Sequence, residues 1–296
     1  MATYSLQNDL LSIVLNEAGG ELTSIIKNQD NTQYLWNADP NYWMRHSPIL
    51  FPIVGSLKNQ TFSFNDQTYS LPQHGFARDM NFVVEEKTDS TILFSLSATD
   101  ETKKVYPFSF KLLNRYTLTG NQIRVDWEVI NTDDQTIYFS IGGHPAFYCP
   151  LKEDEKQSDY FIAFDTKVPL HYIIANEQSL AITKPKNEQT VLQTENGIYS
   201  ITPDFFDQDA LIIEDHQCHM VSLLDPSKKP YVSVSFDAPL FGLWSPARKN
   251  APFICIEPWY GRCDSVNFTG DFNDRDYINE LAIGSTFKAF YTITIH

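Results

Sequence analysis

Residues 122–130 read QIRVDWEVI, and this stretch decides the fold class. Hydrophobic residues occupy every second position from Ile123 to Val129, and charged residues occupy the positions between them. A period of two is typical of a β-strand with one buried face and one solvated face. Turn-forming residues precede the stretch at positions 119–121 and follow it at positions 131–135. The sequence therefore predicts a long strand bounded by tight turns.

Short apolar segments separated by turns recur along the whole chain. After the turn at 131–135, the segment Thr136–Ile141 resumes as a strand, which predicts a meander of hairpins. At most, residues 151–158 and a few residues near Phe205 form short helical turns. The other expected strands are Leu10–Leu15, Leu22–Ile26, Thr61–Phe64, Thr68–Leu71, Phe82–Glu85, Thr91–Leu96, Tyr160–Phe164, Gly197–Ile201, Ala210–Ile213, Met220–Leu224, Tyr231–Phe236 and Phe253–Ile256. No low-complexity linker or repeat interrupts them, so we predict one all-β domain over residues 1–296, built as a large antiparallel β-sandwich.

The composition excludes several classes of partner. The 22 Lys and Arg residues against 37 Asp and Glu residues leave a formal charge of −15, which disfavours nucleic acid and anionic membranes. The first residues lack the basic and apolar regions of a secretory signal, and no run of about 18 apolar residues occurs. We therefore expect a cytoplasmic protein that binds neither a membrane nor nucleic acid.

The four cysteines predict neither a disulfide framework nor a metal site. They are irregularly spaced, without a CxxC pair, at Cys149, Cys218, Cys255 and Cys263. Residues 215–219 read DHQCH, but this crowded segment lacks the second ligand pair of a structural zinc site. We interpret it as a solvated turn and predict no metal.

A first candidate site segment reads PQHGFARD over residues 72–79, directly after an expected hairpin. Loops at strand ends often carry function, and here His74 and Arg78 flank a glycine turn. Arg45 lies in the apolar stretch 43–52, where a buried guanidinium needs a partner. Arginines near a histidine suit a polyhydroxylated or anionic ligand. The structural alternatives are a surface-turn histidine and an arginine in a salt bridge at a strand end.

Two later segments each place one ionisable residue between an apolar strand and Pro or Gly. His144 lies in IGGHPAF, residues 141–147, and Glu257 lies in FICIEPWYG, residues 253–261. Burial among aromatic neighbours raises the pKa of a carboxyl group toward a catalytically useful value. The alternatives are a histidine that caps a strand and a glutamate that faces solvent. We predict that His74, His144 and Glu257 converge in one pocket.

These segments, taken in order, resemble the aldose 1-epimerase (galactose mutarotase-like) family. The resemblance rests on Arg45, on HGFAR at residues 74–78, on Gly-His-Pro at 143–145 and on Glu-Pro-Trp at 257–259. It spans essentially the whole chain and implies a large antiparallel β-supersandwich.

The resemblance also implies roles for individual residues. Glu257 corresponds to the general base, His144 to the general acid, and His74 and Arg45 to hydrogen-bond partners of the substrate. The family also carries an aspartate that holds sugar hydroxyls; among Asp204, Asp207 and Asp209 we favour Asp209, which immediately precedes an expected strand. Trp259, Tyr260 or Phe76 offers an apolar platform for the sugar, with core packing as the alternative.

The chemistry of mutarotation suits these residue types. A base takes the proton of the anomeric hydroxyl, an acid protonates the ring oxygen, and rotation before reclosure gives the other anomer. The reaction needs no cofactor, and the expected partner is a small-molecule sugar or sugar phosphate. The form HGFAR is more similar to the branch that acts on hexose 6-phosphates, which makes Arg78 a candidate phosphate contact.

Two other functions remain open at this point. One is a non-catalytic carbohydrate-binding protein on the same fold, which the presence of both acid and base disfavours. The other is a polysaccharide hydrolase or lyase, which needs a second carboxylate beside Glu257 or a basic groove. The sequence is compatible with a monomer or a homodimer.

Overall fold

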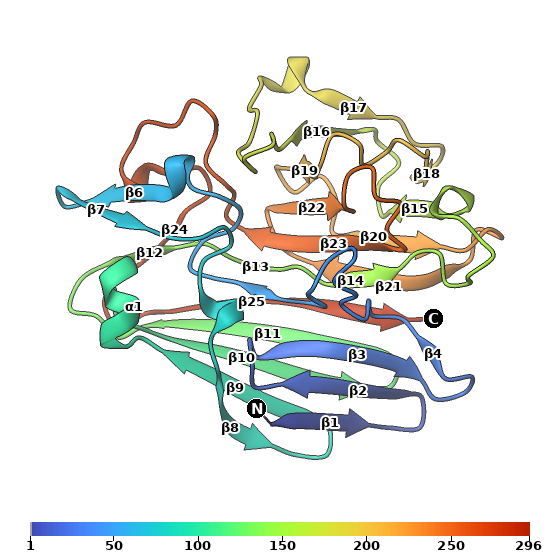
Figure 1. Cartoon of the computed structure of the whole chain (residues 1–296), viewed down its shortest axis with the longest axis horizontal. Helices are drawn as coiled ribbons and strands as arrows, with labels where there is room; N and C mark the ends of the chain where they lie inside the picture. Colours follow the sequence, from blue (N-terminus) through green and yellow to red (C-terminus); the bar gives the residue numbers. More distant parts are fainter. Residues whose placement is uncertain (1) are drawn as a thin grey trace.

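The fold is built around three ten-residue antiparallel strands that lie side by side. The computed structural model describes residues 2–296. Strand β11 (Gln122–Asn131) pairs with β10 (Phe110–Thr119) on one side and with β25 (Thr286–Ile295) on the other. Trp127, at the centre of β11, is buried, as the alternating pattern predicts. Figure 1 shows these three strands crossing the middle of the molecule.

Two large sheets carry most of the strands, and all their ladders are antiparallel. The nine-stranded sheet has the order β18 (Ile198–Ser200), β15 (Phe161–Phe164), β20 (Met220–Leu224), β21 (Pro230–Phe236), β25, β11, β10, β9 (Thr91–Ser97) and β8 (Val83–Lys87). The eight-stranded sheet has the order β17 (Thr190–Leu192), β16 (Leu170–Ile174), β19 (Leu211–Ile213), β22 (Leu240–Trp244), β23 (Phe253–Tyr260), β13 (Ile141–Gly143) and β5 (Ile49–Leu50), with β14 (Ala146–Tyr148) also paired to β23. The predicted all-β class, a large antiparallel sandwich, is confirmed.

Smaller sheets complete the structure. A four-stranded sheet has the order β1 (Thr3–Gln7), β2 (Leu11–Asn16), β3 (Glu21–Lys27) and β4 (Thr32–Gln33), and two-stranded sheets join β6 (Thr61–Phe64) to β7 (Gln67–Ser70) and β12 (Ile137–Phe139) to β24 (Asn279–Leu281). The predicted hairpins β2–β3, β6–β7 and β8–β9 are confirmed.

The expected meander beyond β11 is wrong. The predicted strand 136–141 is two strands, β12 and β13, which belong to different sheets. Both edges of β11 are already occupied by β10 and β25, so β12 pairs with β24 instead. Between them, the N–H of Ser140 donates to the carbonyl of Pro52, which leads the chain across to the eight-stranded sheet.

The short helices also differ from expectation. The region 151–158 contributes only the start of a 3₁₀ turn at Gln157–Asp159, and residues 203–208 form turns. The α-helix is α1 (Asp100–Val105), where Thr99 and Thr102 cap each other reciprocally. A six-residue helix has too short a periodic pattern to be recognised in the sequence.

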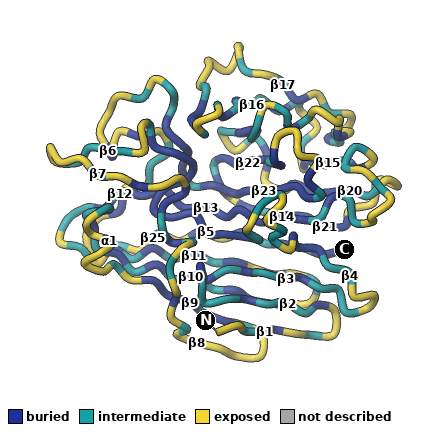
Figure 2. The backbone as a smooth tube through the Cα atoms, in the orientation of Figure 1, coloured by how far each residue is buried: buried dark blue, intermediate teal, exposed yellow. Residues whose placement is uncertain are grey.

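A single large hydrophobic cluster includes residues from Leu6, near the N-terminus, to Ile295, near the C-terminus. Figure 2 shows buried backbone running along β5, β13 and β23, and exposed backbone at the β6–β7 hairpin and near β17. Within residues 2–296, no helix has the length and apolar character needed to cross a bilayer. The single-domain organisation stays a prediction.

Candidate active site

The centre of the site is the break between β13 and β14, opposite β23. Gly142 pairs with Trp259, and Ala146 pairs with Cys255. Residues 143–145 therefore lie opposite residues 256–258, which brings His144 to Glu257. Strand β13 can lie this close to Trp259 of β23 because Gly142 has no side chain. A Cβ on Gly142 would lie 2.6 Å from a ring carbon of Trp259.

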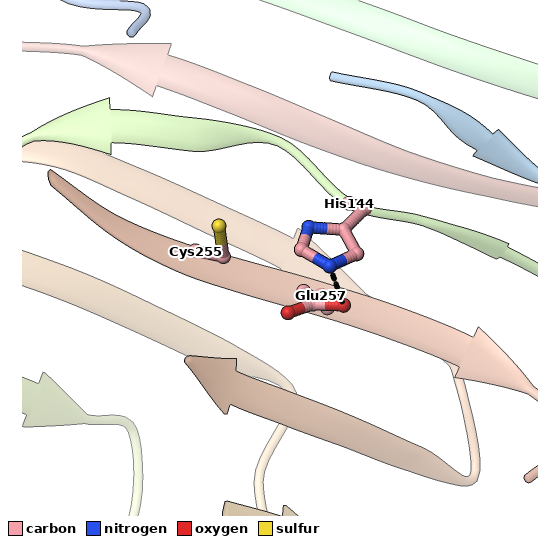
Figure 3. A group of neighbouring side chains, drawn as sticks. All are labelled: His144, Cys255 and Glu257. Atoms are coloured by element: carbon pink, nitrogen blue, oxygen red, sulfur yellow. Dashed lines mark ion pairs between the residues drawn. The ribbon is translucent and has the colours of Figure 1, made fainter. Parts of the chain in front are cut away.

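His144 and Glu257 form a buried pair. The imidazole Nε2 lies 3.2 Å from the carboxyl Oε2, although the two atoms do not have the geometry of a regular hydrogen bond. Figure 3 shows the imidazole facing the carboxyl group, with Cys255 on the same strand as Glu257. The residues are 6% and 1% exposed, so little solvent screens them.

Burial disfavours charge on both members of this pair. It raises the pKa of Glu257 well above its usual value, and the negative charge of Asp209 adds to that rise. Burial, followed by the positive charge of Arg78, lowers the pKa of His144 to about 3. Both shifts favour the state in which the pair holds one proton, on Glu257, and has no net charge. Moving that proton from Oε2 to Nε2 creates a carboxylate and an imidazolium.

His74 lies beside this pair, so the structure brings the three predicted residues together. Its ring centroid is 5.5 Å from that of His144. Its Nδ1 accepts the N–H of Gly55 at 3.0 Å, which leaves Nε2 as the protonated nitrogen. Burial, followed by the charge of Arg78, lowers the pKa of His74 well below its usual value. His74 is therefore a neutral hydrogen-bond donor.

The loop that presents His74 depends on glycine. His74 has a φ of 65° and Gly75 a φ of 70°. A Cβ on Gly75 would lie 2.3 Å from the carbonyl oxygen of Phe51. Only glycine fits this close approach in the left-handed region, so Gly75 fixes the position of the imidazole before it.

The two predicted arginines lie in different settings. Arg78 lines the cavity, donates from Nη2 to the carbonyl of Gln73 at 2.7 Å, and has a buried Nε without a hydrogen-bond partner in residues 2–296. Burial lowers its pKa to about 10, so it remains a cation. Arg45 forms an ion pair with Asp79 at 2.8 Å and is not among the cavity-lining residues. Its predicted contact with the substrate stays a prediction.

Asp209 is the one of the three candidate aspartates that lines the cavity. Its φ is 74°, and its Oδ1 accepts hydrogen bonds at 2.8 Å from the N–H of Ala210 and from Nε1 of Trp244. Burial raises its pKa. Asp204 is exposed and Asp207 is partly buried, and neither lines the cavity.

Three tryptophans form much of the apolar wall. Trp259 is the predicted platform residue that lines the cavity, together with Trp43 and Trp244. The other two platform candidates pack in the core: Tyr260 lies against Phe287 and Phe76 against Phe110. The sequence analysis did not predict Trp43 and Trp244, because neither belongs to a motif. The available signal for Trp43 was its place two residues before Arg45, at the start of the apolar stretch 43–52.

The cavity has a volume of about 320 Å³, in the range of small-molecule sites. Within residues 2–296, its lining residues include buried polar atoms without a hydrogen-bond partner: His144 Nδ1, Glu257 Oε2, Trp259 Nε1 and Arg78 Nε. A cavity of this size that is lined by an ionisable pair, an arginine and three tryptophans fits a small polar ligand.

Two groups of side chains have the spacing of metal ligands. His144, Cys255 and Glu257 form one, and exposed His216, His219 and Asp237 form the other. Burial raises the pKa of Cys255 well above its usual value, whereas metal ligation needs a thiolate. His216 belongs to the solvated turn after β19. We assign neither group to a metal.

Known proteins match this chain over most of its length. The family model for aldose 1-epimerase matches residues 2–270. The chromosomal protein LacX of Lactococcus lactis is 33% identical over 300 residues, covering 99% of both chains. A galactose mutarotase related enzyme from Lactobacillus acidophilus has a TM-score of 0.93 at 34% identity, over 100% of this chain and 97% of that one. A galactose mutarotase-like protein from Lactobacillus casei has a TM-score of 0.90 at 29% identity, with both chains fully covered.

Proposed function

The chain belongs to the aldose 1-epimerase family, and we propose that it interconverts the α and β anomers of an aldohexose or a hexose 6-phosphate. The acid and base are His144 and Glu257. His74, Arg78 and Asp209 hold the sugar hydroxyls.

One proton shared by the pair is sufficient for this reaction. The proton first moves from Glu257 to His144 across the 3.2 Å contact. Glu257, now a carboxylate, takes the proton of the anomeric hydroxyl, and the imidazolium of His144 gives its proton to the ring oxygen as the C1–O5 bond breaks. Ring opening leaves Glu257 protonated and His144 neutral, which is the state that burial favours. Rotation about C1–C2 and the reverse steps deliver the other anomer.

The observation that carries the proposal is the buried pair of His144 and Glu257, which both line the cavity. His74, Arg78 and Asp209 line the same cavity. A pyranose presents hydroxyl groups around its rim and C–H groups on its faces, so it can meet these polar side chains while packing against the tryptophans.

Of the two candidate substrates, an aldohexose and a hexose 6-phosphate, the position of Arg78 favours the phosphate. It is the cationic residue among the cavity-lining residues, and its Nε lacks a partner in residues 2–296. A phosphate at this position gains a charge-assisted hydrogen bond. Asp79 lies 2.8 Å from Arg45 Nη2 and 3.9 Å from Arg78 Nε, so two arginines share one carboxylate and the excess positive charge suits an anion.

Polarimetry with freshly dissolved α-glucose and α-galactose, and exchange NMR with their 6-phosphates, tests the proposal. We expect acceleration of anomer exchange above the uncatalysed rate at pH 7. Absence of acceleration for all four sugars would overturn the catalytic proposal, and sugar binding without acceleration would support the carbohydrate-binding alternative. A higher kcat/KM for the phosphates would assign Arg78 to phosphate recognition.

A further inference from the structure

We propose that Glu21, the first residue of β3, is a positioning residue for the proposed reaction. Glu21 is not among the cavity-lining residues. Its carboxylate holds the loop of residues 43–47, and this loop places the indole of Trp43 against His144 and along the cavity. The effect on catalysis rests on the proposed function, whereas the placement of the loop does not.

Glu21 accepts hydrogen bonds from two consecutive backbone N–H groups of this loop. Its Oε1 lies 2.9 Å from the nitrogen of His46 and 2.9 Å from that of Ser47. Bonds to a carboxylate are charge-assisted and stronger than bonds between neutral groups. The Glu21 side chain is 15% exposed and Ser47 is buried, so water has little access to these bonds. Loss of the carboxylate leaves the N–H of Ser47 without its acceptor, which destabilises this conformation of the loop.

The position of Glu21 is itself fixed by the nine-stranded sheet. Glu21 follows the turn of Gly19 and Gly20, whose φ values are 72° and 54°. The carbonyl of Gly20 accepts Nδ2 of Asn114 at 3.0 Å and the hydroxyl of Tyr116 at 2.9 Å. Both donors are buried residues of β10, and Figure 1 shows β3 lying against that strand. A side chain on such a fixed support can hold a neighbouring loop in one position.

The same loop is also bonded to the segment that carries His144. The carbonyl of His46 accepts the N–H of Ala146 at 3.0 Å, and the carbonyl of Pro48 accepts the N–H of His144 at 3.1 Å. Residues 46–48 therefore lie between the Glu21 carboxylate and the proposed acid and base pair. A shift of the loop changes how Trp43, three residues before His46, covers the imidazole of His144.

Glu17, before the same glycine turn, provides a matched control. Its Oε1 accepts the hydroxyl of Tyr4 at 2.6 Å, and its Oε2 accepts the N–H of Ala2 at 3.2 Å. This carboxylate therefore fastens the first strand to the turn. If Glu21 served only stability, Glu17→Ala and Glu21→Ala should have similar effects on the kinetics, whereas positioning predicts an effect of Glu21→Ala alone.

A double-mutant cycle measures whether Glu21 acts through Trp43. We expect Glu21→Ala to lower kcat/KM for the preferred sugar by about threefold to fivefold, because a displaced indole loses part of its aromatic contact. Glu21→Gln keeps an acceptor oxygen at the same reach and should stay within about twofold of wild type. In the Trp43→Ala background, Glu21→Ala should cost less than about twofold. Glu17→Ala should leave kcat/KM within about twofold in both backgrounds.

Three kinetic results would overturn the proposal. They are an unchanged kcat/KM in Glu21→Ala, an equal loss in Glu17→Ala, and an undiminished loss from Glu21→Ala in the Trp43→Ala background. Glu21→Asp keeps the charge but is shorter by one methylene group, and it gives the same comparison if Glu21→Ala does not fold.

The indole N–H signals of ¹⁵N-labelled tryptophan test the placement of the loop without turnover. The chain has five tryptophans, and the signal of Trp43 is the one that Trp43→Phe lacks. We expect this signal to shift in Glu21→Ala and to stay in place in Glu21→Gln and Glu17→Ala. An unshifted signal in Glu21→Ala would overturn the proposal. If the wild-type protein isomerises no sugar but the signal shifts, the proposed function fails and the placement of Trp43 by Glu21 stands.

Discussion

Trp43 lies flat against His144, with ring centroids 4.7 Å apart and ring planes inclined by 28°. Trp43 also lines the cavity, so one indole both covers the imidazole and borders the sugar site. This contact joins a loop far upstream in the sequence to the centre of the proposed acid and base pair.

Replacing Trp43 should therefore weaken catalysis as well as binding. We expect Trp43→Ala to lower kcat/KM by about threefold to tenfold, because an aromatic contact contributes about 0.5–1.5 kcal/mol beyond its buried area. Trp43→Phe keeps a ring over His144 and should recover most of the loss. Steady-state polarimetry measures both variants. An unchanged kcat/KM in Trp43→Ala would show that the indole contributes neither to catalysis nor to sugar binding.

Glu257→Gln should remove the base while preserving the shape of the site. The amide cannot exchange a proton with His144, so we expect kcat to fall by about 10²–10⁴-fold. Sugar binding, measured by saturation-transfer NMR, should remain, and His144→Asn should behave in the same way. Glu280→Gln, at an exposed position of β24, is the control. Activity near that of wild type in Glu257→Gln would exclude Glu257 as the base.

Asp209→Asn should move the alkaline limb of the pH profile to lower pH. The active pair holds one proton, so loss of that proton, governed by the raised pKa of Glu257, sets the alkaline limb. The charge of Asp209 contributes to that raised pKa, and its removal lowers the pKa. The measurement is kcat/KM against pH, with Asp207→Asn as the control. An alkaline limb that stays in place or moves upward would contradict this coupling.

Stability should depend on the pH through the same carboxyl group. The folded protein holds the proton of Glu257 above the usual pKa of 4.5, at which the unfolded chain releases it. Between 4.5 and the folded pKa the unfolded chain binds fewer protons, so this group makes the free energy of unfolding fall as the pH rises. Urea unfolding at pH 5 and pH 9 should show a smaller fall for Glu257→Gln than for wild type. Equal falls in the two proteins would contradict the raised pKa.

Asp264→Asn should destabilise the fold through a buried ion pair. Arg275 Nε lies 2.6 Å from Asp264 Oδ1, and both side chains are almost fully buried. The variant leaves the Arg275 charge without a counter-charge, which costs about 3–5 kcal/mol. Glu101→Gln breaks the exposed pair with Lys104 and should cost less than about 1 kcal/mol. Urea unfolding measures the free energy of unfolding of both variants. Similar losses would show that the buried ion pair stabilises the fold no more than the exposed one.

The sequence determined the strands and the turn chemistry because these depend on neighbouring residues. Alternation in 122–130 predicted β11, and HGF at 74–76 predicted the glycine turn that presents His74. Alternation cannot specify which edge a strand will pair with, because pairing depends on residues far away in the chain. The separation of β12 from β13 was missed for this reason.

The tertiary structure decided which of the candidate residues meet. The pairing of β23 with β13 and β14 places His144 opposite Glu257, although 112 positions separate them in the sequence. The same packing puts Arg45 on Asp79 rather than in the cavity wall and brings Trp43 and Trp244 into it. The sequence by itself determined residue types suited to acid and base chemistry. Their charge states depend on burial, which only the packed sheets provide.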